Sequence, residues 1–140
     1  MSDVRLFVSY DVDHDVDLCD RLIEESIRGG SGFALAARSA KGEVTDAWRD
    51  TTRARIQDSD HVIFLCSQDT ANASGVNEEF RIVQEEQKPH LLLWARREQM
   101  CTMPKGAKAG SMYQWTRETL TEQLSPRLRN AQARRAAKRP

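Results

Sequence analysis

Two adjacent carboxylates, Glu78 and Glu79, stand near the start of a predicted amphipathic helix, in the segment NASGVNEEF at residues 72–80. On a helical wheel Glu79 lies beside Phe80 and three residues from Val76, which places it on the shoulder of the buried face. Glu78 points more toward solvent. Acids in the first turn of a helix are also stabilised by its dipole. The pattern therefore allows two interpretations: a pair of structural acids, or one carboxylate that enters a crevice beside the core.

A second group of acids follows the first predicted strand, without any glycine: Asp11, Asp13, Asp15 and Asp17. A loop without glycine lacks the bare backbone amides that approach a pyrophosphate, which excludes a Rossmann or P-loop site. A phospho-receiver site would need an acceptor aspartate at the tip of the third strand, where this chain has Cys66 and Ser67. For Asp13, Asp15 and Asp17 we prefer stabilisation of the following helix by its dipole.

The histidines and cysteines are scattered over the chain, and we predict no metal site. No His/Cys spacing is typical of zinc, and the histidines lie on different elements, so neither a metal triad nor a Cys/His nucleophile pair is indicated and structural roles are expected for His14, His61 and His90. Cys66 lies at a carboxyl strand end, but no base accompanies it, and a buried cysteine usually acts as a small hydrophobe. Together with the distant Cys19 and Cys101, it indicates free thiols in a reducing compartment.

Hydrophobic periodicity predicts five short strands that alternate with helices. The strands are expected at residues 4–10, 33–36, 61–67, 90–95 and 111–115. Helices are expected at residues 15–28, at 45–58 with Thr45 as N-cap, from the SGVNEE segment to Pro89, and at 116–129. Their predicted buried faces are Val16, Cys19, Ile23 and Ile27 in the first helix, Trp48, Thr52 and Ile56 in the second, and Val76, Phe80 and Val83 in the third.

This alternation predicts an α/β fold: a flavodoxin-like, five-stranded, mostly parallel sheet with helices on both faces. Ligands of such sheets bind at the carboxyl ends of the strands. The segments to examine for a site are therefore SYDVDHD, the polar loop at residues 37–43, SQDTANASGVNEE and ARREQ.

Length and charge limit the remaining possibilities. The 140 residues suffice for one domain, which we place at residues 1–128, followed by a basic, flexible tail at residues 129–140. Six of the 21 basic residues lie in residues 126–140, which hold no acid; the other 15 face 21 acids and leave the body a charge of about −6. That sign argues against a nucleic-acid groove on the domain. No signal peptide or long apolar run is found, so a cytoplasmic protein is expected.

The order of these segments resembles the Toll/interleukin-1 receptor (TIR) superfamily, particularly the short bacterial TIR-like proteins of the Thoeris antiphage type. The resemblance spans roughly residues 4–128. It rests on LFVSYDVDHD, IQDSDHVIFLCSQDT, SGVNEEF, KPHLLLW and SMYQWTRETL, taken in this order. Each segment alone is weakly specific.

The resemblance implies a catalytic role for Glu79, because members that hydrolyse or cyclise NAD carry a glutamate at the start of the helix after the third strand. It implies that Ser9, Tyr10 and Asp11 line the nucleotide pocket. The loop after the second strand, with Arg38 and Ser39, would contribute ligand contacts and self-association. Gly75 stands four residues before Glu79, where the family often has Trp.

These implications favour an NAD-consuming enzyme that uses NAD as substrate, needs no cofactor, and signals to a downstream effector in antiphage defence. One alternative is a non-catalytic adaptor or decoy that acts through TIR–TIR association, which Gly75 favours. A weaker alternative is a nucleoside-processing enzyme of related shape, similar to the deoxyribosyltransferases. No specific nucleic acid and no transmembrane segment are expected among its partners.

Overall fold

The computed structural model describes residues 3–28 and 30–124, which form a single sheet of five parallel strands in the order β2-β1-β3-β4-β5. The strands are β1 (Val4–Ser9), β2 (Phe33–Arg38), β3 (His61–Cys66), β4 (His90–Trp94) and β5 (Met112–Gln114). The helices are α1 (Val16–Ser26), α2 (Asp46–Gln57), α3 (Ser74–Glu86) and α4 (Arg117–Gln123), with a short 3₁₀ turn at Thr70–Asn72. This confirms the predicted flavodoxin-like α/β fold, with a sheet that is parallel throughout.

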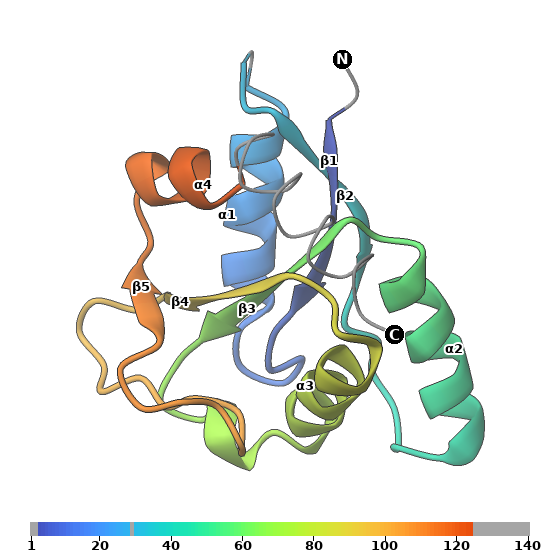
Figure 1. Ribbon diagram of the computed structural model, residues 1–140. Coiled ribbons are helices and arrows are strands. Elements are labelled where there is room, and N and C mark those ends of the chain that lie inside the picture. Colours follow the sequence, from blue (N-terminus) through green and yellow to red (C-terminus); the bar gives the residue numbers. More distant parts are fainter. Residues whose placement is uncertain (1–2, 29, 125–140) are drawn as a thin grey trace.

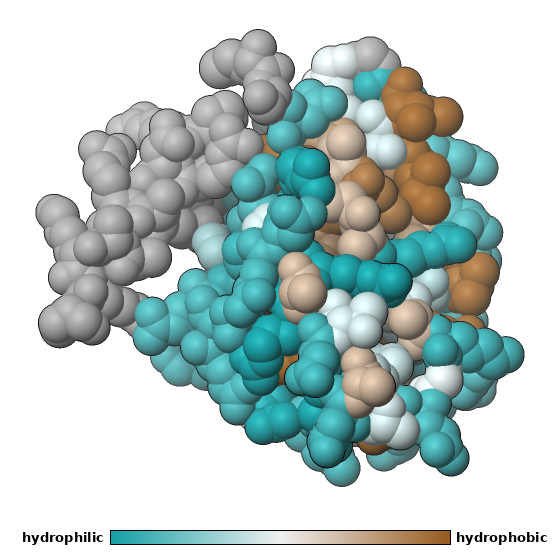
Figure 2. Space-filling view, turned by 90° about the vertical axis from the view of Figure 1, so that its right-hand side faces the viewer, coloured by the Kyte–Doolittle hydropathy of each residue, from teal (hydrophilic) through white to brown (hydrophobic). Residues whose placement is uncertain are grey.

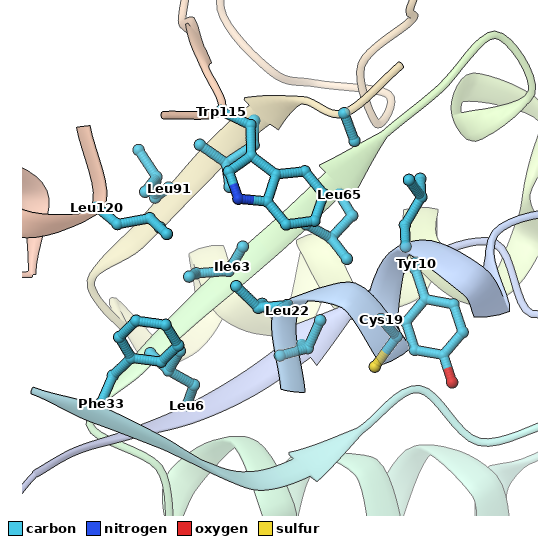
Figure 3. Packing of buried hydrophobic residues seen from close by; sticks show 14 of the residues in the cluster. Leu6, Tyr10, Cys19, Leu22, Phe33, Ile63, Leu65, Leu91, Trp115 and Leu120 are labelled. Carbon is cyan, nitrogen blue, oxygen red and sulfur yellow. The ribbon is translucent and has the colours of Figure 1, made fainter. Parts of the chain in front are cut away.

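Two hydrophobic cores, one on each face, sandwich the sheet, as expected where helices cover both sides (Figure 1). Alternate residues of β3 divide between them, so that Ile63 and Leu65 face α1 and α4 while Val62 and Phe64 face α2 and α3. Figure 3 shows the first core, where Leu22 of α1 and Trp115, just after β5, lie over the strands. All of β3 is buried, because it is the central strand.

Strand order brings distant segments to one edge. Successive strands are added on one side of β1 as far as β2 and on its other side from β3 onward, so the carboxyl ends of the neighbours β1 and β3, at Ser9 and Cys66, flank the expected ligand crevice. The loop after β2 and the first turns of α3 lie at the same edge, since Ser39 donates its backbone N–H to the carbonyl of Val8 and its hydroxyl to Glu79 of α3.

Two of the helices predicted from the sequence begin where they were expected, and in both a threonine hydroxyl caps the first turn. Thr45 accepts a hydrogen bond from the backbone N–H of Trp48, at 3.1 Å, and begins α2. Thr116 caps α4 in the same way through Thr119, at 3.0 Å. The predicted extension of this helix to residue 129 and the predicted tail at residues 129–140 lie outside the described residues.

Three local predictions are wrong. In α1 the predicted buried face holds for Cys19 and in part for Ile23, but Val16 and Ile27 are 44% and 79% exposed, because the helix is rotated to place Leu18 and Leu22 on the sheet. β2 continues through Ala37 and Arg38, which were expected in a loop, because the pairing with β1 extends past a register shift. α3 ends at Glu86 rather than at Pro89, because Gln87 adopts the left-handed conformation and caps the helix.

The surface of the face that bears α2 is mainly hydrophilic, with hydrophobic residues gathered toward one upper edge (Figure 2). Among the described residues, no helix combines the length and the apolar character needed to cross a membrane.

Candidate functional site

Glu79 is fully buried, with no exposed surface, on the face of α3 that packs against the sheet. A carboxylate in such a position is costly to bury and is found inside proteins only with compensating polar partners. Its neighbour Phe80 belongs to the apolar core of that face, as the helical pattern predicts. The helix therefore carries one acid into the interior at the carboxyl end of the sheet.

Two serines from separate strands hold one oxygen of this carboxylate. The hydroxyls of Ser9, at the end of β1, and Ser39, just after β2, each donate to Oε1 of Glu79 at 2.7 Å. Ser39 is itself fixed, because its Oγ accepts the backbone N–H of Tyr10 at 3.1 Å. Both serines are buried, so these bonds form in a water-poor environment where each is stronger than at the surface.

The second oxygen, Oε2, is buried and has no hydrogen-bond partner among the described residues. Burial raises the pKa of Glu79 to about 7, although the hydrogen bonds from Ser9 and Ser39 act in the opposite direction. The carboxyl group can therefore take up or release a proton near neutral pH. Buried acids with a perturbed pKa and an unsatisfied oxygen are more frequent at functional sites than elsewhere in proteins.

Glu78 has the opposite environment. It lies between Arg49 of α2, at 3.0 Å, and Arg81, one turn further along α3. Hydrogen bonding to Arg81 lowers the pKa of Glu78. The helical wheel correctly separated the two acids, but the partner of Glu78 is a pair of arginines rather than the helix dipole, since α3 has no acid in its first turn.

A hollow of about 480 Å³ opens beside this carboxylate, at the carboxyl edge of the sheet. Its walls come from the segment after β1, the loop after β2, and the start of α3, at residues 10–13, 41–43 and 73–76. Glu79 lies one helical turn behind Val76, which lines the hollow, and does not itself reach the surface.

The start of α3 presents bare backbone to the hollow. Its N-cap residue, Ala73, offers no side-chain cap, so the first amides of the helix are open to an anion. Gly75 leaves this approach free of a side chain. A Cβ at Gly75 would lie 3.7 Å from the ring of Trp48, so an aromatic of α2 already occupies the neighbouring space. Trp48 also donates from Nε1 to the carbonyl of Ala40, at 3.3 Å, and so ties down the loop after β2.

The sequence-predicted pocket residues divide into three groups. Tyr10 and Asp11 line the hollow, whereas Ser9 and Ser39 are buried behind it and hold Glu79. Arg38 takes neither place, since its guanidinium lies 3.7 Å from Asp20 of α1. Lys41, which was not singled out in the sequence, lines the hollow and brings the positive charge that Arg38 does not supply there.

A buried network that the sequence did not indicate lies at the same edge of the sheet. Asp15, predicted only as a dipole partner, is 1% exposed and accepts a hydrogen bond from Ser67 at 2.6 Å. Arg96 donates to Asp15 at 3.1 and 3.2 Å and to Asp17 at 2.7 Å, and thus ties the loop after β4 to α1. No sequence spacing links residues so far apart in the chain.

Asp11, His14 and Asp69 place one ligand atom each within 4.8 Å of one another, a proximity that the scattered histidines did not suggest. His14 Nδ1 lies 2.7 Å from a carboxylate oxygen of Asp11, and this hydrogen bond raises the pKa of His14. The same nitrogen lies 3.8 Å from a carboxylate oxygen of Asp69.

Comparison with known families finds no family model that matches this sequence, and comparison with curated proteins finds no match. The interpretation of the site therefore rests on its geometry and on the sequence pattern.

Proposed function

We propose that this protein is a TIR-like enzyme that cleaves the nicotinamide glycosidic bond of NAD, with Glu79 as its catalytic residue. The observation that carries the proposal is the burial of a single carboxylate, with one oxygen held by Ser9 and Ser39 and the other free, beside a hollow at the carboxyl edge of a parallel sheet. Open parallel sheets bind their ligands at this edge.

The chemistry needs little more than such a group. The bond between the ribose C1′ and the nicotinamide nitrogen breaks, and its electron pair stays on the departing nitrogen, so nicotinamide leaves neutral and needs no general acid. The ribose acquires oxocarbenium character, which the carboxylate of Glu79 stabilises in a water-poor site. Water then adds to C1′ and loses a proton, giving ADP-ribose; attack by the adenine ring instead gives a cyclic product.

The hollow suits the rest of a dinucleotide. The uncapped amide N–H groups at the start of α3 and the ammonium group of Lys41 can donate hydrogen bonds to the diphosphate. Gly75 permits the close approach of the diphosphate to the backbone. Because Glu79 has no exposed surface, some of the residues that cover it, such as Ser9 or Ser39, must move for the ribose to reach it. In this proposal the product signals to a downstream effector in antiphage defence, and TIR surfaces mediate self-association.

A direct test is to incubate the full chain with NAD, alone and with a crowding agent or infected-cell lysate, and to measure nicotinamide and the mass of the second product. Release that is abolished in Glu79→Ala supports the proposal. No nicotinamide under any condition, or unchanged release by the variant, contradicts it.

Two observations favour a non-catalytic adaptor as the second candidate: the complete burial of Glu79 and the glycine at position 75. An adaptor would bind another TIR domain and ignore the nucleotide. Thermal unfolding with and without NAD separates the two, because a ligand that binds only the folded state raises the melting temperature. No shift with NAD, together with association with a TIR partner, would favour the adaptor.

A further inference from the structure

A second pocket lies on the other face of the sheet from Glu79, between α1 and α4. Its volume is about 150 Å³. Phe33, Trp115 and Leu120 form its apolar wall, each no more than 6% exposed, and all three belong to the core beneath α1 (Figure 3). Because Phe33 opens β2 and the pocket also includes Gly30 and Ser31, it lies toward the amino edge of the sheet, away from the candidate active site.

The rim of this pocket is positively charged, with Arg21, Arg28 and Arg117 against the single acid Glu25. Arg21 and Glu25 contact each other and the indole of Trp115. The guanidinium of Arg21 lies 4.1 Å from the centre of that ring and 3.7 Å from a carboxylate oxygen of Glu25. The other oxygen of Glu25 accepts the indole N–H, at 3.4 Å.

Arg28 and Arg117 are different. Within residues 3–28 and 30–124, neither guanidinium is paired with a carboxylate, and residues 125–140 contain no Asp or Glu that could supply one. Arg117 is also the first residue of α4, where a cation is disfavoured by the helix dipole. Helix stability therefore does not explain an arginine at this position, at the mouth of an apolar pocket.

We propose that this pocket binds a small anion that carries one flat ring. The ring lies against Phe33 and Leu120 beside Trp115, whose ring face is covered by Arg21, and its carboxylate or phosphate group lies between Arg28 and Arg117. An apolar cavity of roughly 150 Å³ is large enough for benzene, and guanidinium groups recognise both kinds of anion through paired N–H donors. The inference uses none of the residues around Glu79 and stands apart from the proposed NAD chemistry.

The test is a titration of the ¹⁵N-labelled full chain, followed through the indole N–H signal of Trp115. The probes are benzoate, phenyl phosphate, the neutral isostere benzamide, and inorganic phosphate. The indole signals of Trp48 and Trp94, which lie elsewhere, serve as internal controls. Saturable shifts of the Trp115 signal with benzoate or phenyl phosphate are expected. The probe that binds more tightly shows whether the pocket prefers a carboxylate or a phosphate group.

Arg117→Gln and Arg28→Gln should each weaken this binding about tenfold, the effect of one charged hydrogen-bonding partner. Arg55→Gln, an exposed arginine of α2, is the matched control and should bind as the parent does. Four results overturn the proposal: no shift of Trp115 with any probe, equal binding of benzamide, equal binding of inorganic phosphate, or unchanged binding in both rim variants.

Discussion

Replacement of Glu79 by Gln should change how the stability of the protein depends on pH. Burial raises the pKa of this carboxyl from its ordinary 4.5 to about 7. At about 1.4 kcal/mol per pH unit, keeping the group ionised in the folded protein costs about 3 kcal/mol.

The sign follows from proton binding. Between pH 4.5 and 7 the folded protein keeps a proton on Glu79 that the unfolded chain has released, so the free energy of unfolding falls as pH rises. Above pH 7 Glu79 is ionised in both the folded and the unfolded protein, and the free energy of unfolding falls no further on its account. A glutamine at position 79 does not titrate, and the variant lacks this slope.

The assay is urea unfolding of both proteins in a pH series from 4 to 8. The free energy of unfolding of the parent, minus that of Glu79→Gln, should decrease by about 3 kcal/mol across the series. Any constant effect of the glutamine, such as an unsatisfied amide N–H, shifts this difference by the same amount at every pH and leaves its change with pH unaffected. A difference independent of pH would refute the claim that the buried carboxyl titrates near neutrality.

Glu78→Gln is the matched control and should behave in the opposite sense. Arg81 and Arg49 lower the pKa of Glu78, so its contribution to stability is present above its ordinary pKa and is lost as pH falls. The two neighbouring variants should therefore show opposite trends with pH.

Three further predictions follow from the geometry. Ser9→Ala and Ser39→Ala each remove a hydrogen bond that lowers the pKa of the buried carboxyl, so a ¹³C NMR titration of that carboxyl should give a pKa above the parent value; an unchanged pKa would mean that the serines do not hold it. Gly75→Ala should raise the free energy of unfolding by roughly 0.5–1 kcal/mol, because its Cβ meets only ordinary contact, yet should weaken NAD binding in a calorimetric titration; tighter binding would contradict backbone approach at this residue. Arg96→Met should lower the free energy of unfolding by roughly 3 kcal/mol in urea, since Asp15 would remain buried without its cation; a loss below about 1 kcal/mol would show that Ser67 alone suffices.

The fold could be predicted from the sequence because each element follows a local rule. Continuous apolar runs such as residues 61–66 predict strands buried on both faces, and hydroxyl caps such as Thr45 fix helix starts. The predicted face of α1 was wrong at Val16 because Val16 and Leu18 are both apolar, and only the packing of the helix on the sheet decides which of the two is buried.

At the site, the separation of Glu78 from Glu79 was predictable, since neighbouring residues of a helix point in different directions. The bonds from Ser9 and Ser39 to Glu79 were not, because they join residues 70 and 40 positions apart through the order of the strands. The position of Arg38 near Asp20 could not be predicted either, because the side of the sheet on which Arg38 lies depends on how far β2 extends along β1.

The most direct test of the proposed function is the rate of nicotinamide release from NAD by the parent protein, Glu79→Gln and Glu78→Gln, measured side by side under one activating condition. We expect release by the parent, a loss of about 100-fold or more in Glu79→Gln, and a rate within about threefold of the parent in Glu78→Gln. Equal rates for the parent and Glu79→Gln would contradict the central role assigned to the buried carboxylate.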